Sequence, residues 1–150
     1  MSPGALYRYF PSKTEIIRAM VAEDLAEQTG YFDHLDDAPD FIEGLLDALV
    51  TTVLMVREPA YRTIALEVAA EAERDEEVGR MLDEAMAASR TRLTGLIEAA
   101  QRRGSVRAEV DASSAAHLIL AMLDGGASLT MPVAALRRVL GDLLECWLGV

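Results

Sequence analysis

The sequence predicts an all-α protein, and two observations lead to that expectation. Apolar residues recur with the helical period of 3.6 residues along the chain, and no stretch alternates convincingly between apolar and polar residues. Hydrophobic residues make up 51% of the 150 residues, with only five prolines, which is typical of a folded chain with one sizeable core. We therefore expect a single bundle of about seven helices.

The first two predicted helices are separated by Pro11. In the first, Pro3 suits the opening turn, where the N–H group that it lacks is not needed. The tyrosines and the arginine that follow can project outward as an aromatic and basic face. After the proline, Ser12 and Glu15 form the pattern of a capping box. We expect the second helix to run from about residue 13 to 29 and to end near Gly30.

The third and fourth helices are also delimited by prolines. Pro39 is a favoured first-turn residue, so we expect the third helix over residues 39–57, stopped by the Glu58-Pro59 pair. The fourth is expected over residues 60–73.

The remaining helices carry the clearest capping signals in the chain. Asp75 is placed to cap the fifth helix, and two glutamates follow it in the first turn. That helix ends where two arginines precede Gly104. Asp111 is placed to cap a sixth helix that reaches about Met131, with a Gly-Gly pair in its middle. The seventh helix is expected over residues 132–148.

The last two predicted helices carry matching apolar stripes. In the seventh, apolar residues recur at alternating spacings of three and four, as in a coiled-coil seam. Either this pair of helices crosses inside an ordinary core, or two such pairs form a four-helix interface between two copies of the chain. The residues that would form the homodimer interface are Leu118, Met122, Gly125, Leu129, Leu136, Leu140, Leu143 and Trp147.

The sequence offers little for catalysis or metal binding. Two histidines and one cysteine form no recognisable constellation of nucleophile, base and orienting group. Neither His34 nor His117 belongs to the Glu-x-x-His motif that a di-iron bundle requires. Glu67 and Glu71 share a helix face, but they belong to an acidic stretch that is typical of a solvated surface. We expect no enzyme activity, no metal and no cofactor.

Charge and targeting signals narrow the functional class further. The net charge of −11 argues against a nucleic-acid binder taken as a whole, although the first 18 residues hold three basic side chains against one acidic side chain. No signal peptide and no apolar stretch of 18 residues is present. The single Cys146 rules out an internal disulfide and fits a reducing compartment. We expect a cytoplasmic protein with no membrane partner.

The sequence supports a small-molecule pocket better than it supports a catalytic site. The third to fifth helices carry broad apolar stripes with many methionines, whose flexible side chains can pack around a ligand. Polar residues within these stripes could orient a small apolar or amphipathic effector, or could simply form satisfied hydrogen bonds in a core. The candidate pocket residues are Leu49, Val53, Ile64, Val68, Met86, Arg90, Leu93, His117 and Asp124.

The opening motif carries a family resemblance. The pattern S-x-G-A-L-Y-x-Y-F-x-S-K over residues 2–13, followed by an apolar helix, resembles the recognition helix and following turn of the tetracycline-repressor (TetR) family of bacterial transcription regulators. The resemblance implies contacts of Tyr7 and Lys13 with DNA phosphates, with Tyr9 on the same exposed face. It also implies a major-groove position for four residues, which are Ser2, Pro3, Gly4 and Ala5.

The resemblance also implies an organisation and a mechanism. Residues 1–12 would be the remnant of a helix-turn-helix, and residues 13–150 an effector-binding and dimerisation domain. Members of the family carry two more helices before this motif, and a helix-turn-helix needs both of its helices. We therefore expect a ligand-responsive regulator, most simply a repressor, that binds operator DNA only when those helices are present. The alternative is a ligand-binding or dominant-negative dimerisation partner that never binds DNA.

Overall fold

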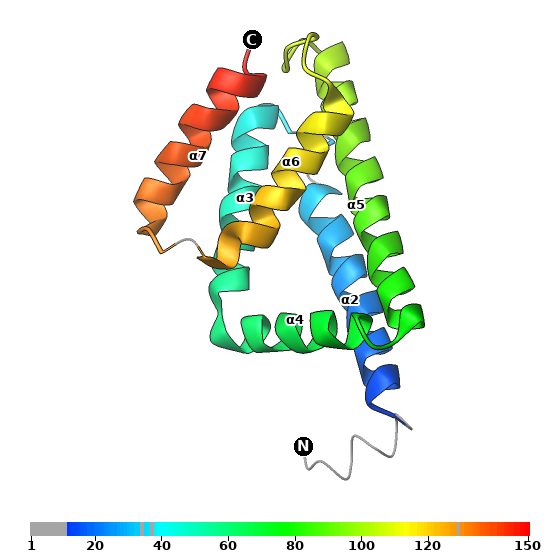
Figure 1. Ribbon diagram of the computed structural model, residues 1–150. Helices are drawn as coiled ribbons and strands as arrows, with labels where there is room; N and C mark the ends of the chain where they lie inside the picture. The colour runs from blue at the N-terminus through cyan, green and yellow to red at the C-terminus, as the bar shows by residue number, and fades with distance from the viewer. Residues whose placement is uncertain (1–11, 34, 37, 129) are drawn as a thin grey trace.

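The computed structural model of the chain describes residues 12–33, 35–36, 38–128 and 130–150. These residues form six α-helices and one short 3-10 segment, without any strand among them (Figure 1). The predicted fold class is therefore confirmed. The predicted first helix lies outside the described residues.

Local signals in the sequence mark where α2 and α4 begin. Helix α2 (Lys13–Asp33) starts directly after Ser12, whose Oγ accepts a hydrogen bond from the backbone N–H of Glu15 at 3.1 Å. Helix α4 (Pro59–Ala72) begins at its proline, as the missing N–H of that residue favours. The predicted end of α2 near Gly30 was wrong, because the helix continues through this glycine.

Helix α3 (Phe41–Arg57) begins two residues later than predicted. The side chain of Asp40 accepts a hydrogen bond from the backbone N–H of Glu43 at 3.1 Å. This side-chain cap defines the first turn more strongly than the preceding Pro39 does. The helix ends at Arg57, as predicted, and the next helix follows within two residues.

Helix α5 (Glu76–Arg102) has the predicted boundaries. The carboxylate of Asp75 accepts hydrogen bonds from the backbone N–H groups of Glu77 and Val78, at 2.9 and 3.2 Å. After the helix, Gly104 adopts a φ of 73°, the left-handed conformation that glycine allows without strain.

The prediction for the sixth helix was wrong at its end. Helix α6 (Ala112–Asp124) stops seven residues early, and Gly125–Ser128 forms the 3-10 segment η1. A Cβ atom added to Gly126 would lie 3.0 Å from Cγ2 of Val53 on α3. The glycine therefore permits a close approach within the same chain. Helix α7 (Val133–Leu148) follows Pro132, as predicted.

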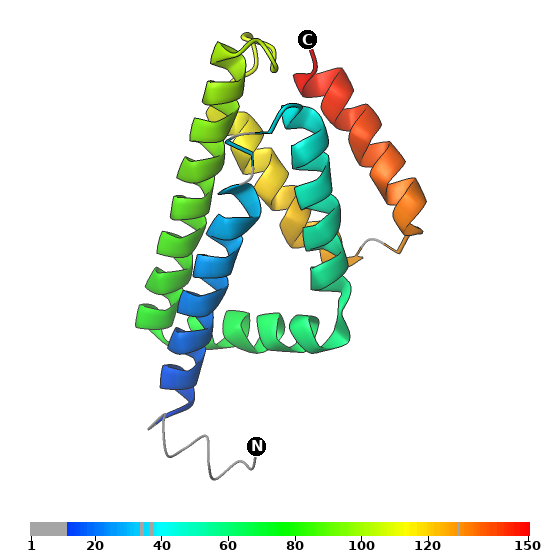
Figure 2. The ribbon, with the colours of Figure 1, turned by 180° about the vertical axis from the view of Figure 1, so that it is seen from behind.

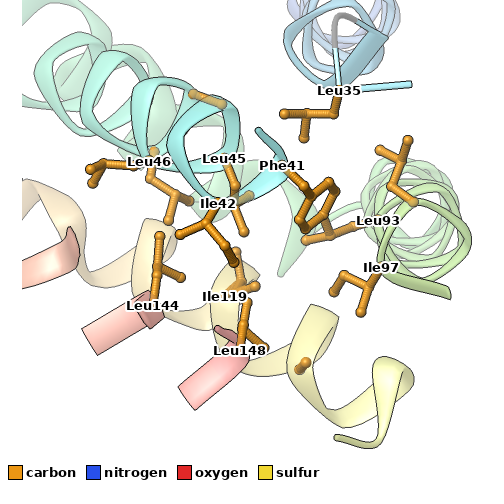
Figure 3. Packing of buried hydrophobic residues seen from close by; sticks show 14 of the residues in the cluster. Leu35, Phe41, Ile42, Leu45, Leu46, Leu93, Ile97, Ile119, Leu144 and Leu148 are labelled. Atoms are coloured by element: carbon orange, nitrogen blue, oxygen red, sulfur yellow. The ribbon is translucent and has the colours of Figure 1, made fainter. Parts of the chain in front are cut away.

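The helices enclose one large core. Figures 1 and 2 show α2 and α5 running side by side, with α4 lying across one end and linking α3 to α5. Helix α6 packs against α5, and α7 packs against α3. Side chains from α3, α5, α6 and α7 fill the space between these helices (Figure 3). Fully buried members of this large core include Phe41, Leu45, Leu93, Ile119 and Leu144.

A second, smaller cluster lies apart from the large core. Ile17 and Val21 of α2 pack with Val78 at the start of α5. Partly buried side chains around them are Val68, Ala72, Met81 and Leu82. We call this group the corner cluster, because it joins α2 to the junction of α4 and α5.

Candidate functional site

The structure divides the nine predicted pocket residues among three environments. Leu49, Val53 and Leu93 are buried together in the large core. Val68 packs instead against the corner cluster. The exposed residues are Ile64, Met86, Arg90, His117 and Asp124. The nine residues therefore do not share one environment, and the ligand-binding role of each residue stays a prediction.

Helix α4 differs from every other described α-helix because none of its side chains is buried. Leu66 is 70% exposed, and Ile64 is also exposed. The helix contacts α3 and α5, between which it forms the connection. Its apolar side chains are consequently available to a ligand or to another part of a larger assembly.

The end of α3 holds a polar feature that the sequence analysis missed. The Nη1 atom of Arg57 donates a hydrogen bond to the backbone oxygen of Met131, at 3.2 Å. The Nε and Nη2 atoms of the same guanidinium are buried without a hydrogen-bond acceptor. The sequence predicted only that the third helix ends at this residue, since nothing in the local pattern reveals that Met131 lies nearby.

Helix α5 contains a second buried group of this kind. Ser89 is almost fully buried, and its Oγ has no hydrogen-bond partner within the described structure. A buried polar group without a partner costs about 1–3 kcal/mol. Ser89 lies one turn before Leu93, so it borders the large core.

Asp124 ends α6 and carries a perturbed carboxyl group. Its side chain is exposed to solvent, but the surrounding protein still desolvates it and raises its pKa above the ordinary value for aspartate. His117, two turns earlier on the helix, is exposed.

The predicted interface residues fall on two sides of α6 and α7. Leu136 and Leu140 are buried inside the chain, while Leu118 is 54% exposed and Leu143 is 42% exposed. Met122 and Trp147 pack at the edge of the large core, and Gly125 is exposed. Leu129 lies outside the described residues. Helix α7 exposes Val139 as well, so it buries one apolar side and leaves a neighbouring apolar side open.

Most of the predicted DNA-contacting residues are not among those that the structure describes. Ser2, Pro3, Gly4, Ala5, Tyr7 and Tyr9 lie outside the described residues. Lys13 is the first residue of α2.

Ion pairs connect the helices at the surface of the bundle. Arg137 of α7 pairs with Glu43 and Asp47 of α3, and the hydrogen bond to Asp47 raises the pKa of its guanidinium further. Arg18 of α2 pairs with Glu77 at the start of α5. Exposed pairs of this kind contribute little to stability.

Metal and membrane sites were also sought within the described part of the chain. No group of three or more histidine, cysteine, aspartate or glutamate side chains there is arranged to hold a metal ion. None of the described helices combines the length and apolar character needed to cross a membrane.

Comparison with known families gives a match over most of the chain. Residues 35–140 match the family described as "Tetracyclin repressor-like, C-terminal domain". The HTH-type transcriptional regulator UidR of Escherichia coli K12 is 23% identical over 125 residues. That alignment covers 83% of this chain, and this chain spans only 63% of the length of the relative.

Solved structures show the same fold. Salmonella enterica GusR is 30% identical, with a TM-score of 0.69, and the match covers 97% of this chain and 80% of GusR. A transcription regulator from Saccharomonospora viridis in complex with choline has a TM-score of 0.73 at 20% identity, over 100% of this chain and 82% of that one. A TetR regulator from Haloarcula marismortui has a TM-score of 0.74 at 19% identity, over 98% and 81%.

Proposed function

Because the chain belongs to the tetracycline-repressor (TetR) family, we propose that it forms the effector-binding and dimerisation body of a ligand-responsive transcriptional regulator, and that this regulator is a repressor. The observation that carries the proposal is the second apolar side of α6 and α7, which the chain itself leaves exposed. The relatives named above are described as transcriptional regulators, which agrees with this class of function.

The dimer is proposed to form by pairing α6 and α7 of one copy with those of another. Leu118 and Leu143 would contribute directly, since each still exposes enough apolar surface to gain from burial. Gly125 would allow close approach at the end of α6. Leu136 and Leu140 take a different role in this proposal: they hold α7 against α3 from inside the chain.

The effector is proposed to bind within the body, near α3, α4, α5 and η1. The exposed apolar side chains of α4 and the unpaired buried donor groups of Arg57 and Ser89 support this location. A fold neighbour in complex with choline supports the idea that this helical architecture can accommodate a small molecule.

Helix α2 is proposed to transmit the signal, because it follows the DNA-reading motif directly in the chain. Its first half is held by the corner cluster and by the pair between Arg18 and Glu77. A ligand that favours one position of α2 changes operator affinity only by its differential affinity for the two states. A coupling of about 1–3 kcal/mol would be sufficient for regulation.

The proposal includes operator binding only when both helices of the helix-turn-helix are present. The 150 residues contain the motif that resembles the second helix of a helix-turn-helix, and both helices are required to hold it in the groove. We therefore expect these residues to dimerise without selecting a DNA sequence. Tight, sequence-selective binding in a gel-shift assay would contradict this expectation.

The dimer is tested by light scattering on the wild-type chain and on Leu143→Asp. The wild type should show twice the chain mass of 16.3 kDa. The variant should shift toward the monomer, because a carboxylate replaces the leucine side chain at the proposed interface. Leu66→Asp on α4 is the matched control, since it also places a charge at an exposed leucine. A monomeric wild type would refute the interface.

The alternative function is a dominant-negative partner, which the same surface would serve. Such a protein would form mixed dimers with an intact relative and withdraw it from DNA. Native mass spectrometry of the chain mixed with a full-length relative distinguishes the two functions, because only the alternative requires mixed dimers.

A further inference from the structure

The orientation of the unpaired atoms of Arg57 defines a specific kind of acceptor. Nε and Nη2 lie on one edge of the planar guanidinium, and their two N–H groups point in parallel. Nη1 is already occupied by the backbone oxygen of Met131. The free edge is therefore the complete fork that binds two oxygens of one carboxylate.

Apolar side chains precede Arg57 in the last turns of α3. Gly126 of η1 lies against Val53 and Val56, which occupy the last turns of α3 before Arg57. Met131 packs at the edge of the large core. Helix α4 begins two residues after the end of α3 (Figure 1), and η1 contacts α3.

No carboxylate of the described part of the chain pairs with Arg57, although other arginines of the bundle do pair with acidic side chains. Glu58, the next residue, is exposed and caps α3 through its backbone. The Arg57 side chain is only partly buried, but its Nε and Nη2 atoms are covered and lack an acceptor. Covered N–H groups without an acceptor are costly, and a bound anion would remove that cost.

We propose that Arg57 anchors the effector through a carboxylate, so that the effector is an amphipathic carboxylic acid whose apolar part contacts α3 and η1. This inference rests on the proposed function and names its ligand class. It distinguishes the chain from the fold neighbour that holds choline, since a quaternary ammonium would be repelled by the guanidinium. In this proposal Arg57 is the cation that orients the effector, and the exposed Arg90 no longer has that role.

The test uses hexanoate, octanoate and decanoate as probes, because a flexible chain adapts to an apolar site of any shape. The matched primary amides and alkyltrimethylammonium ions serve as neutral and cationic comparisons. Binding is measured by calorimetry with the wild-type chain, with Arg57→Gln and with Arg90→Gln. Arg57→Lys, which keeps the charge but not the fork, serves as a second variant, and circular dichroism confirms that each protein is folded.

The wild type should bind the best carboxylate at least about tenfold more tightly than its amide, in keeping with a charge-assisted bidentate pair. Arg57→Gln should lose that preference, Arg57→Lys should retain part of it, and Arg90→Gln should retain all of it.

Three outcomes would overturn the inference: no carboxylate binds, the amide or the ammonium ion binds equally well, or the two glutamine variants lose the preference to the same extent. A preference for octyl phosphate over octanoate would overturn the assignment to a carboxylate. If the amide binds as tightly as the carboxylate, the ligand class is wrong but the proposed effector site is still supported. The light-scattering and DNA experiments test the proposed function independently.

Discussion

The large core and the corner cluster hold the same chain together in different ways. The large core joins α3, α5, α6 and α7 through many fully buried side chains. The corner cluster holds the first half of α2 through three buried residues and a few partly buried neighbours. Local stability follows the number of buried apolar contacts. The difference indicates a firm body and a weakly held segment. The weakly held segment follows directly after residues 2–13, whose sequence resembles a TetR recognition helix and turn.

The largest expected effect comes from truncating a side chain of the large core. Leu93→Ala should lower the free energy of unfolding by about 4 kcal/mol, because the fully buried leucine leaves a cavity among tightly packed neighbours. Urea denaturation followed by circular dichroism measures this change. A loss below about 1 kcal/mol would mean that the core can relax around the missing side chain.

Truncation in the corner cluster should have a smaller and more local effect. Ile17→Ala should reduce the free energy of local opening of α2 by about 2 kcal/mol, since few neighbours surround the side chain. Hydrogen exchange read by mass spectrometry should show faster exchange in α2 and unchanged exchange in α6. Equal acceleration in both helices would refute the division into two regions.

The smallest effect is expected at the border between the two regions. Ser89→Ala should stabilise the ligand-free chain by about 1 kcal/mol, because it removes a buried hydroxyl without a partner and improves helix propensity. Thermal unfolding measures the shift, and Thr91→Ala on the exposed side of α5 is the control. A lower melting temperature for Ser89→Ala would show that an ordered water satisfies the hydroxyl.

Much of the fold could be predicted from the sequence because local chemistry determines it. Asp75 and Asp111 cap their helices through side-chain hydrogen bonds within two or three residues, and α3 ends before the Glu58-Pro59 pair. The end of α6 could not be predicted in this way. The Gly-Gly pair belongs to a 3-10 segment, and Gly126 of this pair lies close to Val53. Val53 is more than seventy residues earlier in the chain, so the local sequence does not reveal this contact.

The candidate site was harder to predict than the fold. The seventh helix carries two overlapping apolar stripes, and periodicity does not reveal which one faces inward. The predicted interface stripe on this helix contained Leu136, Leu140, Leu143 and Trp147. The structure buries two of these, Leu136 and Leu140, inside the chain together with Leu144 and Leu148. Arg57 was missed for a related reason, since its hydrogen bond to the backbone oxygen of Met131 joins residues that lie far apart in the sequence.

The absence of buried side chains on α4 affects how the protein can diversify. Substitutions at exposed positions usually change stability by less than about 0.5 kcal/mol, so most positions of α4 can vary without loss of the fold. This helix also borders the proposed effector site. A duplicated copy of the gene could therefore acquire a new ligand preference through changes in α4 while the large core, and with it the folded body, is inherited unchanged.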